Sequence, residues 1–295
     1  MLAVSKALPG STIVWGNEAF NSPDVLEAFD LSTGNVLQQF SPGAVLTGRA
    51  ILVLGTTIYY STVDSNNIYV TDSVTHADDG VLFAAKDANG NPLPGIGDLT
   101  WDGSHLWATP YTQAGVGLNV AYEYTLSGTL LKTITLAYAE GSFDGFDIAN
   151  GRIIANEFDG GLRPGNSYDL YDLDGTPIQR GFITTPDFYS TGVTFDGTYY
   201  IISDVCRASA STCSNALAVY DSSGSFLREV TLGMPLPPPT RIRDLEDITV
   251  PFAAPSVPEP GSVLLLITGL ALLAGLKRRV SHRIRAGASS FFKTR

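Results

Sequence analysis

The chain repeats a pattern about every 47 residues, and this period constrains its fold more than any other feature. Short runs rich in β-branched and aromatic residues recur, and their central residues lie 45, 48, 47 and 47 positions apart: Ile13, Ile58, Leu106, Ile153 and Tyr200. A turn-forming residue stands three positions before each of them: Gly10, Gly55, Gly103, Asn150 and Gly197. A β-rich run behind a tight turn predicts a hairpin, and Asn tolerates the positive φ that such turns need.

Each repeat also carries a second turn and a third β-rich run. The second turns end in glycine and lie at residues 29–34, 86–90, 124–128, 171–175 and 220–224. The third runs lie just before the first turns, at residues 51–53, 99–101, 146–148, 193–195 and 248–250. Four short strands in each of five repeats predict an all-β, five-bladed β-propeller over residues 1–250. A β-sandwich is the alternative, although its strands seldom repeat so regularly.

The last β-rich run, 248–250, has no turn after it. We therefore expect it to close the ring as the innermost strand of the blade whose other strands lie in residues 11–40, because an open ring would expose sheet edges. The turn sequence Tyr-Asp-x-x-Gly at 171–175 and 220–224 resembles that of NHL-type and related propellers. That group has many functions, so the resemblance implies a fold and no substrate.

The C-terminal residues form a different kind of segment. Pro258, Glu259 and Pro260 precede the uncharged residues 261–276, and Lys277, Arg278 and Arg279 end that run. This order resembles the PEP-CTERM sorting tail of bacterial proteins that an exosortase-type membrane enzyme processes. The resemblance covers residues 256–279. It implies an exported protein, anchored in the inner membrane as a precursor and then placed at the cell surface or outside the cell.

The physical chemistry of this tail agrees with the resemblance. Sixteen uncharged residues are close to the roughly 17 that a membrane helix needs, and basic side chains at its end can reach the interface on the cytoplasmic side. We therefore expect a Pro-rich linker at 251–260, a transmembrane sorting helix with its basic stop at 261–279 and a basic tail at 280–295. Residues 1–10 lack the apolar core of an export signal. An export tail without one implies that the natural start lies further upstream.

Charge separates the body from the tail. All 29 acidic residues lie before residue 260, whereas residues 277–295 hold seven of the 18 basic residues. An acidic body repels phosphate backbones, which argues against nucleic acid as a partner. Cations and neutral glycans, among them neutral extracellular polysaccharides, stay open as ligands.

The predicted ring brings the first residues of its inner strands together at one mouth of the central channel, on the face with the long loops. These residues form the pairs 49–50, 97–98, 144–145, 191–192 and 246–247. Arg49, Asp98, Asp144, Glu246 and Asp247 are therefore a candidate ligand or metal site. Carboxylates there suit Ca²⁺, or an acid with an ionised partner that cleaves a glycan, and the plain alternative is that they join the blades. Loop aromatics that suit sugar stacking are Tyr111, Tyr138, Phe143, Phe158, Phe188 and Tyr189.

The remaining reactive residues give weaker signals. Cys206 and Cys213 are close in sequence, and in an oxidising compartment we expect them to form a disulfide. His76, His105 and His282 lie in three separate parts of the chain, which argues against a metal site, and Asp147 falls in mid-strand, which makes it a weaker site candidate. The sequence holds no nucleophile elbow, phosphate loop or dinucleotide fingerprint.

Together these features predict an exported propeller at the cell surface or in the extracellular matrix that binds rather than catalyses. No catalytic residue and no required cofactor are assigned. The alternative is a glycan-active hydrolase or lyase with an acidic site at the channel mouth.

Overall fold

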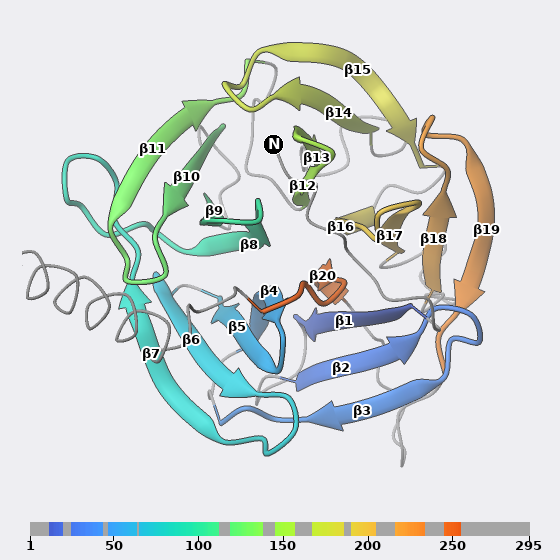
Figure 1. The fold of residues 1–295 in the computed structure, drawn as a ribbon, viewed down its shortest axis with the longest axis horizontal. Coiled ribbons are helices and arrows are strands. Elements are labelled where there is room, and N and C mark those ends of the chain that lie inside the picture. Colours follow the sequence, from blue (N-terminus) through green and yellow to red (C-terminus); the bar gives the residue numbers. More distant parts are fainter. Residues whose placement is uncertain are drawn as a thin grey trace, which may run out of the picture. The chain divides into compact units, whose positions relative to one another are not determined.

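Five antiparallel sheets stand around a central axis like the blades of a propeller (Figure 1). This computed structural model describes residues 12–19, 25–43, 47–63, 65–111, 119–137, 145–156, 167–185, 190–204, 216–233 and 245–254. They all belong to one compact unit, Met1–Ala254. Within these ranges the regular structure consists of β-strands, and no helix there is long and apolar enough to cross a bilayer. The predicted helix at 261–279 lies outside the described residues.

Each blade has four strands, numbered here from the axis outwards. Blade 1 is β20 (Leu245–Thr249), β1 (Ile13–Glu18), β2 (Val25–Asp30) and β3 (Val36–Phe40). Blade 2 is β4 (Gly48–Leu54), β5 (Thr57–Thr62), β6 (Asn67–Asp72) and β7 (Asp78–Ala84). Blade 3 is β8 (Ile96–Trp101), β9 (Leu106–Pro110), β10 (Val120–Tyr124) and β11 (Leu130–Thr135). Blade 4 is β12 (Phe146–Ala149), β13 (Arg152–Asn156), β14 (Ser167–Asp172) and β15 (Pro177–Thr184). Blade 5 is β16 (Ser190–Phe195), β17 (Tyr200–Asp204), β18 (Ala216–Tyr220) and β19 (Phe226–Thr231).

Ring closure follows the prediction. Strand β20 pairs antiparallel with β1, with Thr249 opposite Trp15 and Asp247 opposite Asn17. The end of the described chain thus supplies the innermost strand of the first blade, and Figure 1 shows β20 beside β1 near the axis. Because this pairing joins the two ends of the repeat, closure hides two strand edges that an open ring would expose.

The turns confirm most of the predicted hairpins. Asn150, at the β12–β13 turn, has a φ of 53°, which is the left-handed conformation expected of it. Gly34, at the β2–β3 turn, has a φ of 73°, and a Cβ there would lie 1.9 Å from the carbonyl oxygen of Thr231 in blade 5. This glycine is therefore needed for its backbone angle and for the close contact between neighbouring blades.

The second hairpin of blade 2 was predicted wrongly. Residues 86–90 form a small turn after β7, whereas the β6–β7 turn lies at residues 73–77. Where the other described second turns have glycine, this turn has His76, which holds a φ of 57° and stacks on Phe40 at 4.0 Å between ring centroids. Asp87 and Gly90 have the Asp-x-x-Gly spacing of the other second turns, so the pattern indicated residues 86–90 in place of the true β6–β7 turn. Residues 61–80, which the misplaced turn left as one long loop, contain β6 and the start of β7.

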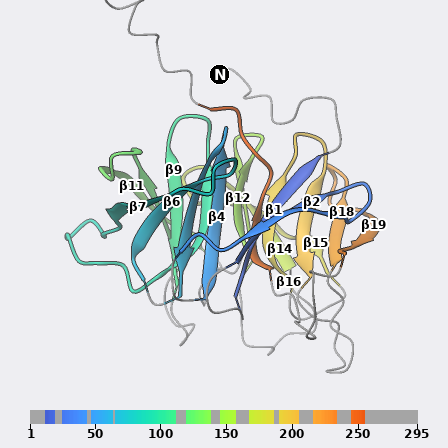
Figure 2. The ribbon, with the colours of Figure 1, turned by 90° about the horizontal axis from the view of Figure 1, so that it is seen from below.

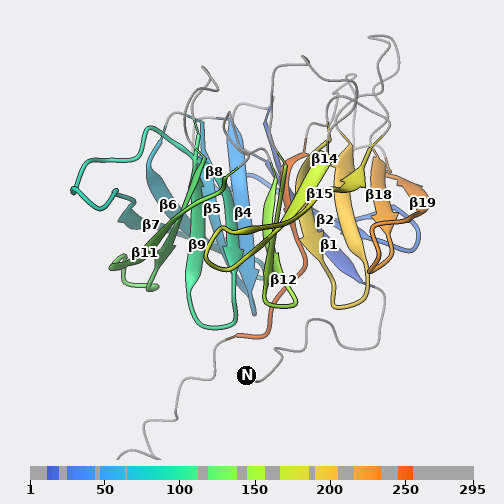
Figure 3. The same cartoon turned by 90° about the horizontal axis from the view of Figure 1, so that it is seen from above.

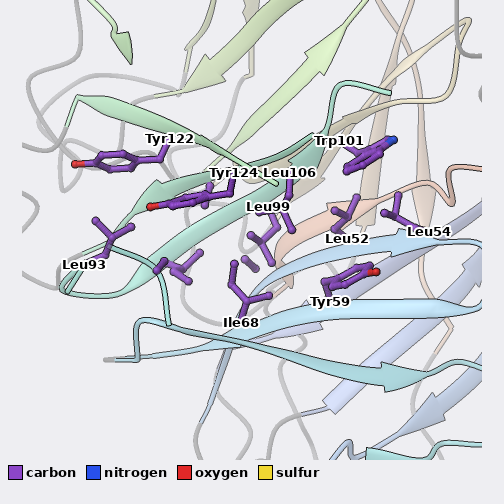
Figure 4. Close-up of a cluster of buried hydrophobic side chains, with 14 of the residues drawn as sticks. Leu52, Leu54, Tyr59, Ile68, Leu93, Leu99, Trp101, Leu106, Tyr122 and Tyr124 are labelled. Carbon is purple, nitrogen blue, oxygen red and sulfur yellow. The ribbon is translucent and has the colours of Figure 1, made fainter. Parts of the chain in front are cut away.

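Apolar side chains fill the space between neighbouring blades. The five buried clusters each join two adjacent blades, and the cluster between blades 2 and 3 is drawn in Figure 4. This cluster includes Leu52 of β4, Ile68 of β6 and Leu99 of β8, together with the rings of Tyr124 and Trp101. Alternate residues of a strand point to opposite faces, so β4 contributes Leu52 to this cluster and Ile51 to the cluster between blades 1 and 2. Stability therefore depends on contacts around the whole ring.

The ring has two different faces. In Figure 3 the β8–β9 and β12–β13 turns lie at the lower end, and Figure 2 shows the same body from the opposite side. We call this end the hairpin face. The inner strands begin at the other end, the loop face, where much of the connecting chain lies outside the described residues.

A short strap follows the closing strand. Phe252 pairs in parallel with Leu54: its N–H donates to Val53 O and its carbonyl accepts from Gly55 N, both at 2.9 Å. Its side chain is buried in the cluster between blades 2 and 3. Residues 251–254 therefore cross from blade 1 to blade 2 on the hairpin face, where Ala254 lies against Gly55 (Figure 3).

Ring closure can be tested at Gly192 of β16. A Cβ on Gly192 would lie 2.7 Å from both Asp247 Cα and Ile248 N of β20, and these backbone atoms cannot rotate away. We expect Gly192→Ala to lower the free energy of unfolding by about 1–3 kcal/mol or more, measured by thermal or denaturant melts. Gly233→Ala is the matched control, because its Cβ would meet its nearest atom at an ordinary 3.5 Å. Equal melts for both variants would contradict the tight β16–β20 contact.

Candidate functional site

The site lies at the loop face, where the inner strands begin with a β-bulge. In blades 1, 2, 3 and 5 two residues of the inner strand lie opposite one residue of the next strand. The bulged pairs are 246–247, 49–50, 97–98 and 191–192, which are the pairs aligned from the sequence. A bulge redirects side chains at a strand end, so the repeat places Arg49, Asp98, Glu246 and Asp247 at this level of the ring. Asp144, the fifth candidate, lies outside the described residues.

A polar residue that the sequence analysis did not single out lies opposite each of these four bulges, and blade 4 has one at the corresponding position. These residues recur at intervals of 44, 48, 47 and 47 within otherwise apolar strands: Asn17, Ser61, Thr109, Asn156 and Ser203. Ser61 Oγ accepts from Ala50 N and donates to Ile96 O of blade 3, both at 3.0 Å. Their regular spacing could have revealed them in the sequence. A buried polar side chain needs a hydrogen-bond partner, and a repeat supplies one at the same place in each blade.

Polar side chains at this level form hydrogen bonds between neighbouring blades. The amide of Asn17 in blade 1 donates to Ala50 O and Ser61 O of blade 2, at 3.0 and 3.1 Å. The amide of Asn156 in blade 4 donates to Ser190 O of blade 5 at 2.9 Å. Thr191 Oγ1 of blade 5 then donates to Leu245 O of blade 1, also at 2.9 Å. These hydrogen bonds between blades therefore help to fix the strand ends that form the mouth.

Arg49 and Glu246 form an ion pair at the mouth, with side chains 9% and 13% exposed. The guanidinium of Arg49 also lies over the ring of Tyr111, 3.6 Å from its centroid. Burial raises the pKa of Glu246, and the positive charge of Arg49 acts in the opposite direction. Tyr111 is a predicted loop aromatic that reaches the site, whereas Tyr138, Phe143, Phe158, Phe188 and Tyr189 lie outside the described residues.

Asp247 lies deeper, and it acts as an acceptor for backbone amides. Its Oδ2 accepts from Ile51 N of β4 at 2.9 Å and from Leu99 N of β8 at 3.3 Å, while Oδ1 accepts from Ile248 N at 2.8 Å. Burial raises its pKa well above the usual value, and the nearby charge of Asp98 adds to this effect. Asp247 is only 1% exposed and three amides donate to its oxygens, so it is a structural acceptor without a path to solvent.

Two further acids are held in a similar way. Asp98 Oδ2 accepts from Thr109 Oγ1 at 2.7 Å in its own blade. Asp147 of β12 accepts from Thr100 Oγ1 of β8 and, at 2.8 Å, from Phe195 N of β16. The mid-strand Asp147, a weaker candidate from the sequence, therefore joins blades 3, 4 and 5 near the axis. The disulfide expected between Cys206 and Cys213 concerns residues outside the described part of the chain.

Comparisons with known proteins support the fold and identify no family. No known family profile matches the chain. Two curated proteins that match it are the major viral transcription factors of equine herpesvirus 1, strains Kentucky A and Ab4p, each 32% identical over 77 residues. Those matches cover 26% of this chain and only 5% of the length of the viral proteins.

Solved structures show a similar architecture. A chain of a nidogen/laminin complex has a TM-score of 0.50 and 10% identity, over 83% of this chain and 100% of that chain. A protein of unknown function from Bacteroides caccae has a TM-score of 0.48 and 12% identity, over 81% and 98%. At such identities the likeness concerns the fold alone.

The charge interaction between Asp98 and Asp247 gives a pH prediction. A carboxyl whose pKa is higher in the folded state than in the unfolded state makes the folded state bind more protons, so stability falls as the pH rises above the unfolded pKa of about 3.9. Asp98→Asn keeps an oxygen for the Thr109 hydroxyl and removes the charge that raises the pKa of Asp247. We expect the loss of unfolding free energy as the pH rises above about 4 to be smaller in this variant than in the wild type, by on the order of 1 kcal/mol.

Denaturant melts at several pH values would measure this. Asp79→Asn is the control, since Asp79 is exposed and its replacement removes the same formal charge. If both variants changed the pH dependence equally, the effect would come from net charge rather than from the Asp98–Asp247 contact.

Proposed function

We propose that this protein is an exported binding module whose loop face holds a ligand above the channel mouth, and that its PEP-CTERM-like tail directs it to the cell surface or extracellular matrix. One observation carries the choice of binding over catalysis. Each mouth carboxylate in the described part of the chain already has a protein partner: Asp98 has Thr109, Glu246 has Arg49, and Asp247 has three amides. Acids held in this way build the mouth and do not act as an exposed acid–base pair.

Tyr111 is the contact that we assign to the ligand. Its ring lies at the mouth and is partly exposed, with Arg49 packed against it at 3.6 Å. An aromatic ring fixed in this way suits stacking on the apolar face of a sugar, and an extracellular polysaccharide is the ligand class that matches both this ring and the acidic body. The chain of similar fold was solved in a nidogen/laminin complex, which agrees with a binding role for such a scaffold.

The alternative is a glycan-active hydrolase or lyase. Its support is the raised pKa of Asp247 beside Asp98, since a protonated acid next to an ionised one is the usual arrangement of a glycosidase. Against it stands the burial of both side chains: Asp247 is 1% and Asp98 0% exposed. A substrate bond would have to approach Asp247 through the same space that the three amides occupy.

The C-terminal segment is the basis for the export that we propose. Residues 251–254, the last described residues before the tail, lie on the hairpin face. Pro258 and Pro260 favour an extended chain, which presents the segment to a processing enzyme of the exosortase type. Residues 261–279 hold the precursor in the membrane until processing.

Ligand binding is tested with purified full-length protein in detergent and immobilised extracellular polysaccharide. We expect Tyr111→Ala to reduce retention at least about fivefold, because each lost aromatic stacking contact contributes on the order of 1 kcal/mol. Tyr199→Ala is the matched control, since Tyr199 is 40% exposed on the opposite, hairpin face. Equal retention by both variants would remove the mouth from the binding site, and release of sugar products by the wild type would favour the enzyme.

The sorting role is tested by changing Pro258, Glu259 and Pro260 together to Ala. Loss of both prolines lets the tail helix extend through the recognition segment, so we expect an unprocessed membrane form that retains residues 277–295. Fractionation with one antibody against the body and another against the basic tail would show it. Changing residues 289–291 to Ala is the control. A wild type that stays in the membrane at full length, in a host with the processing enzyme, would contradict the proposal.

A further inference from the structure

A second cluster of polar side chains lies on the hairpin face of blade 3, at the opposite end of the ring from the mouth. Asp102 follows β8, His105 precedes β9, and Glu123 lies on β10. One ligand atom of each lies within 4.8 Å of the others. We propose that these three residues form a binding site for a divalent transition metal, with Zn²⁺ as the best match. This inference does not rest on the proposed function.

The distances suit a small metal ion. His105 Nδ1 lies 2.7 Å from Glu123 Oε1 and 3.9 Å from Asp102 Oδ2. Zinc bonds of about 2.1 Å place two ligands of a tetrahedral site about 3.4 Å apart. These two separations lie on either side of this value and the third is at most 4.8 Å, so side-chain shifts of up to about 1.4 Å would bring the three atoms to bonding positions. One imidazole and two carboxylates suit Zn²⁺ better than Ca²⁺, which prefers oxygen ligands alone.

Asp102 is already oriented for this role. Its Oδ1 accepts from Ser104 N at 2.7 Å and from His105 N at 2.8 Å, which fixes the carboxylate in the turn. Its Oδ2 accepts from Trp107 Nε1 at 2.9 Å. Metal ligands are commonly held by such outer hydrogen bonds, which keep the first ligands in place before the metal arrives.

Glu123 comes from the neighbouring strand. It lies directly opposite Trp107 in the β9–β10 pairing and opposite Lys132 in the β10–β11 pairing. Lys132 is held by Leu173 O at 2.6 Å and lies 5.9 Å from the centroid of the Trp107 ring. The two carboxylates outnumber this one cation, so the cluster attracts positive charge. The side chains of Asp102, His105 and Glu123 are 19%, 36% and 14% exposed, which leaves a path to solvent.

Blade 5 provides an internal comparison. Asp196 makes the same turn, with Oδ1 accepting from Thr198 N at 2.8 Å and from Tyr199 N at 2.7 Å. At the positions of His105 and Glu123, however, blade 5 has Tyr199 and Val219. The turn therefore folds without an imidazole or a second carboxylate. The hydrogen bonds of the turn explain why residue 102 is an aspartate. They do not explain why residue 105 is a histidine and residue 123 a glutamate, which a metal site would explain.

The experiment uses the full-length chain in detergent after chelator treatment. Zn²⁺ is titrated in competition with a chromogenic indicator, and Co²⁺ absorption reports the coordination geometry. We expect one equivalent of Zn²⁺ to bind, and His105→Tyr and Glu123→Gln each to weaken binding by about tenfold or more. His105→Tyr copies blade 5 and should fold, which melts without metal would check; if it does not fold, Glu123→Gln carries the test.

His76→Gln is the control, because His76 lies in another blade and has Phe40 and Gln38 as its neighbours. Binding of Zn²⁺ that His76→Gln abolishes and His105→Tyr leaves unchanged would overturn the proposal. So would a wild type that binds Zn²⁺ no more tightly than the two cluster variants. The contact between His105 and Glu123 would then be an ion pair within the blade.

Discussion

The inner strand of every blade ends its sheet, and its amide groups on the axis side therefore have no strand to pair with. In a ring of five blades the axis is narrow, and buried N–H groups without acceptors would each cost on the order of 1–3 kcal/mol. Two buried carboxylates supply acceptors: Asp247 to Ile51 N and Leu99 N, and Asp147 to Phe195 N. The ring thus depends on acids at its centre, although burying a charge is itself unfavourable.

The bulges at the loop face also leave backbone groups that need hydrogen-bond partners. A bulge breaks the strand ladder and leaves backbone groups without their usual partners. The polar residue opposite supplies a partner in its own blade, as Thr109 does for Asp98 N, or in the next blade, as Asn17 does for Ala50 O. At the mouth, hydrogen bonds therefore join blade 1 to blade 2, blade 2 to blade 3, blade 4 to blade 5 and blade 5 to blade 1. Changes to the mouth carboxylates act on stability first, which is why Tyr111 is a more selective probe of ligand binding than the acids.

The repeat made much of the fold predictable, because period and turn chemistry are local properties of the sequence. The inner strands, the closure by β20 and the positive φ of Asn150 followed from alignment alone. Blade 2 was misaligned because His76 holds a left-handed conformation with help from Phe40, a contact between blades that no local pattern reveals. Alignment also placed Arg49, Asp98, Glu246 and Asp247 at one level. Which of them pair with each other depended on bulges and on spatial contacts. For the same reason the histidine spacing gave no hint of the cluster at His105, whose carboxylates come from a turn and from the adjacent strand.

The strap after β20 decides how the body responds to force. A pull on the chain beyond Ala254 is first borne by the hydrogen bonds of Phe252 to Val53 and Gly55 and by the buried Phe252 ring. Only after these give way does tension reach the pairing of β20 with β1, on which closure depends. The strap thus protects the pairing of β20 with β1 from any tension on the C-terminal segment that is too weak to break the strap contacts.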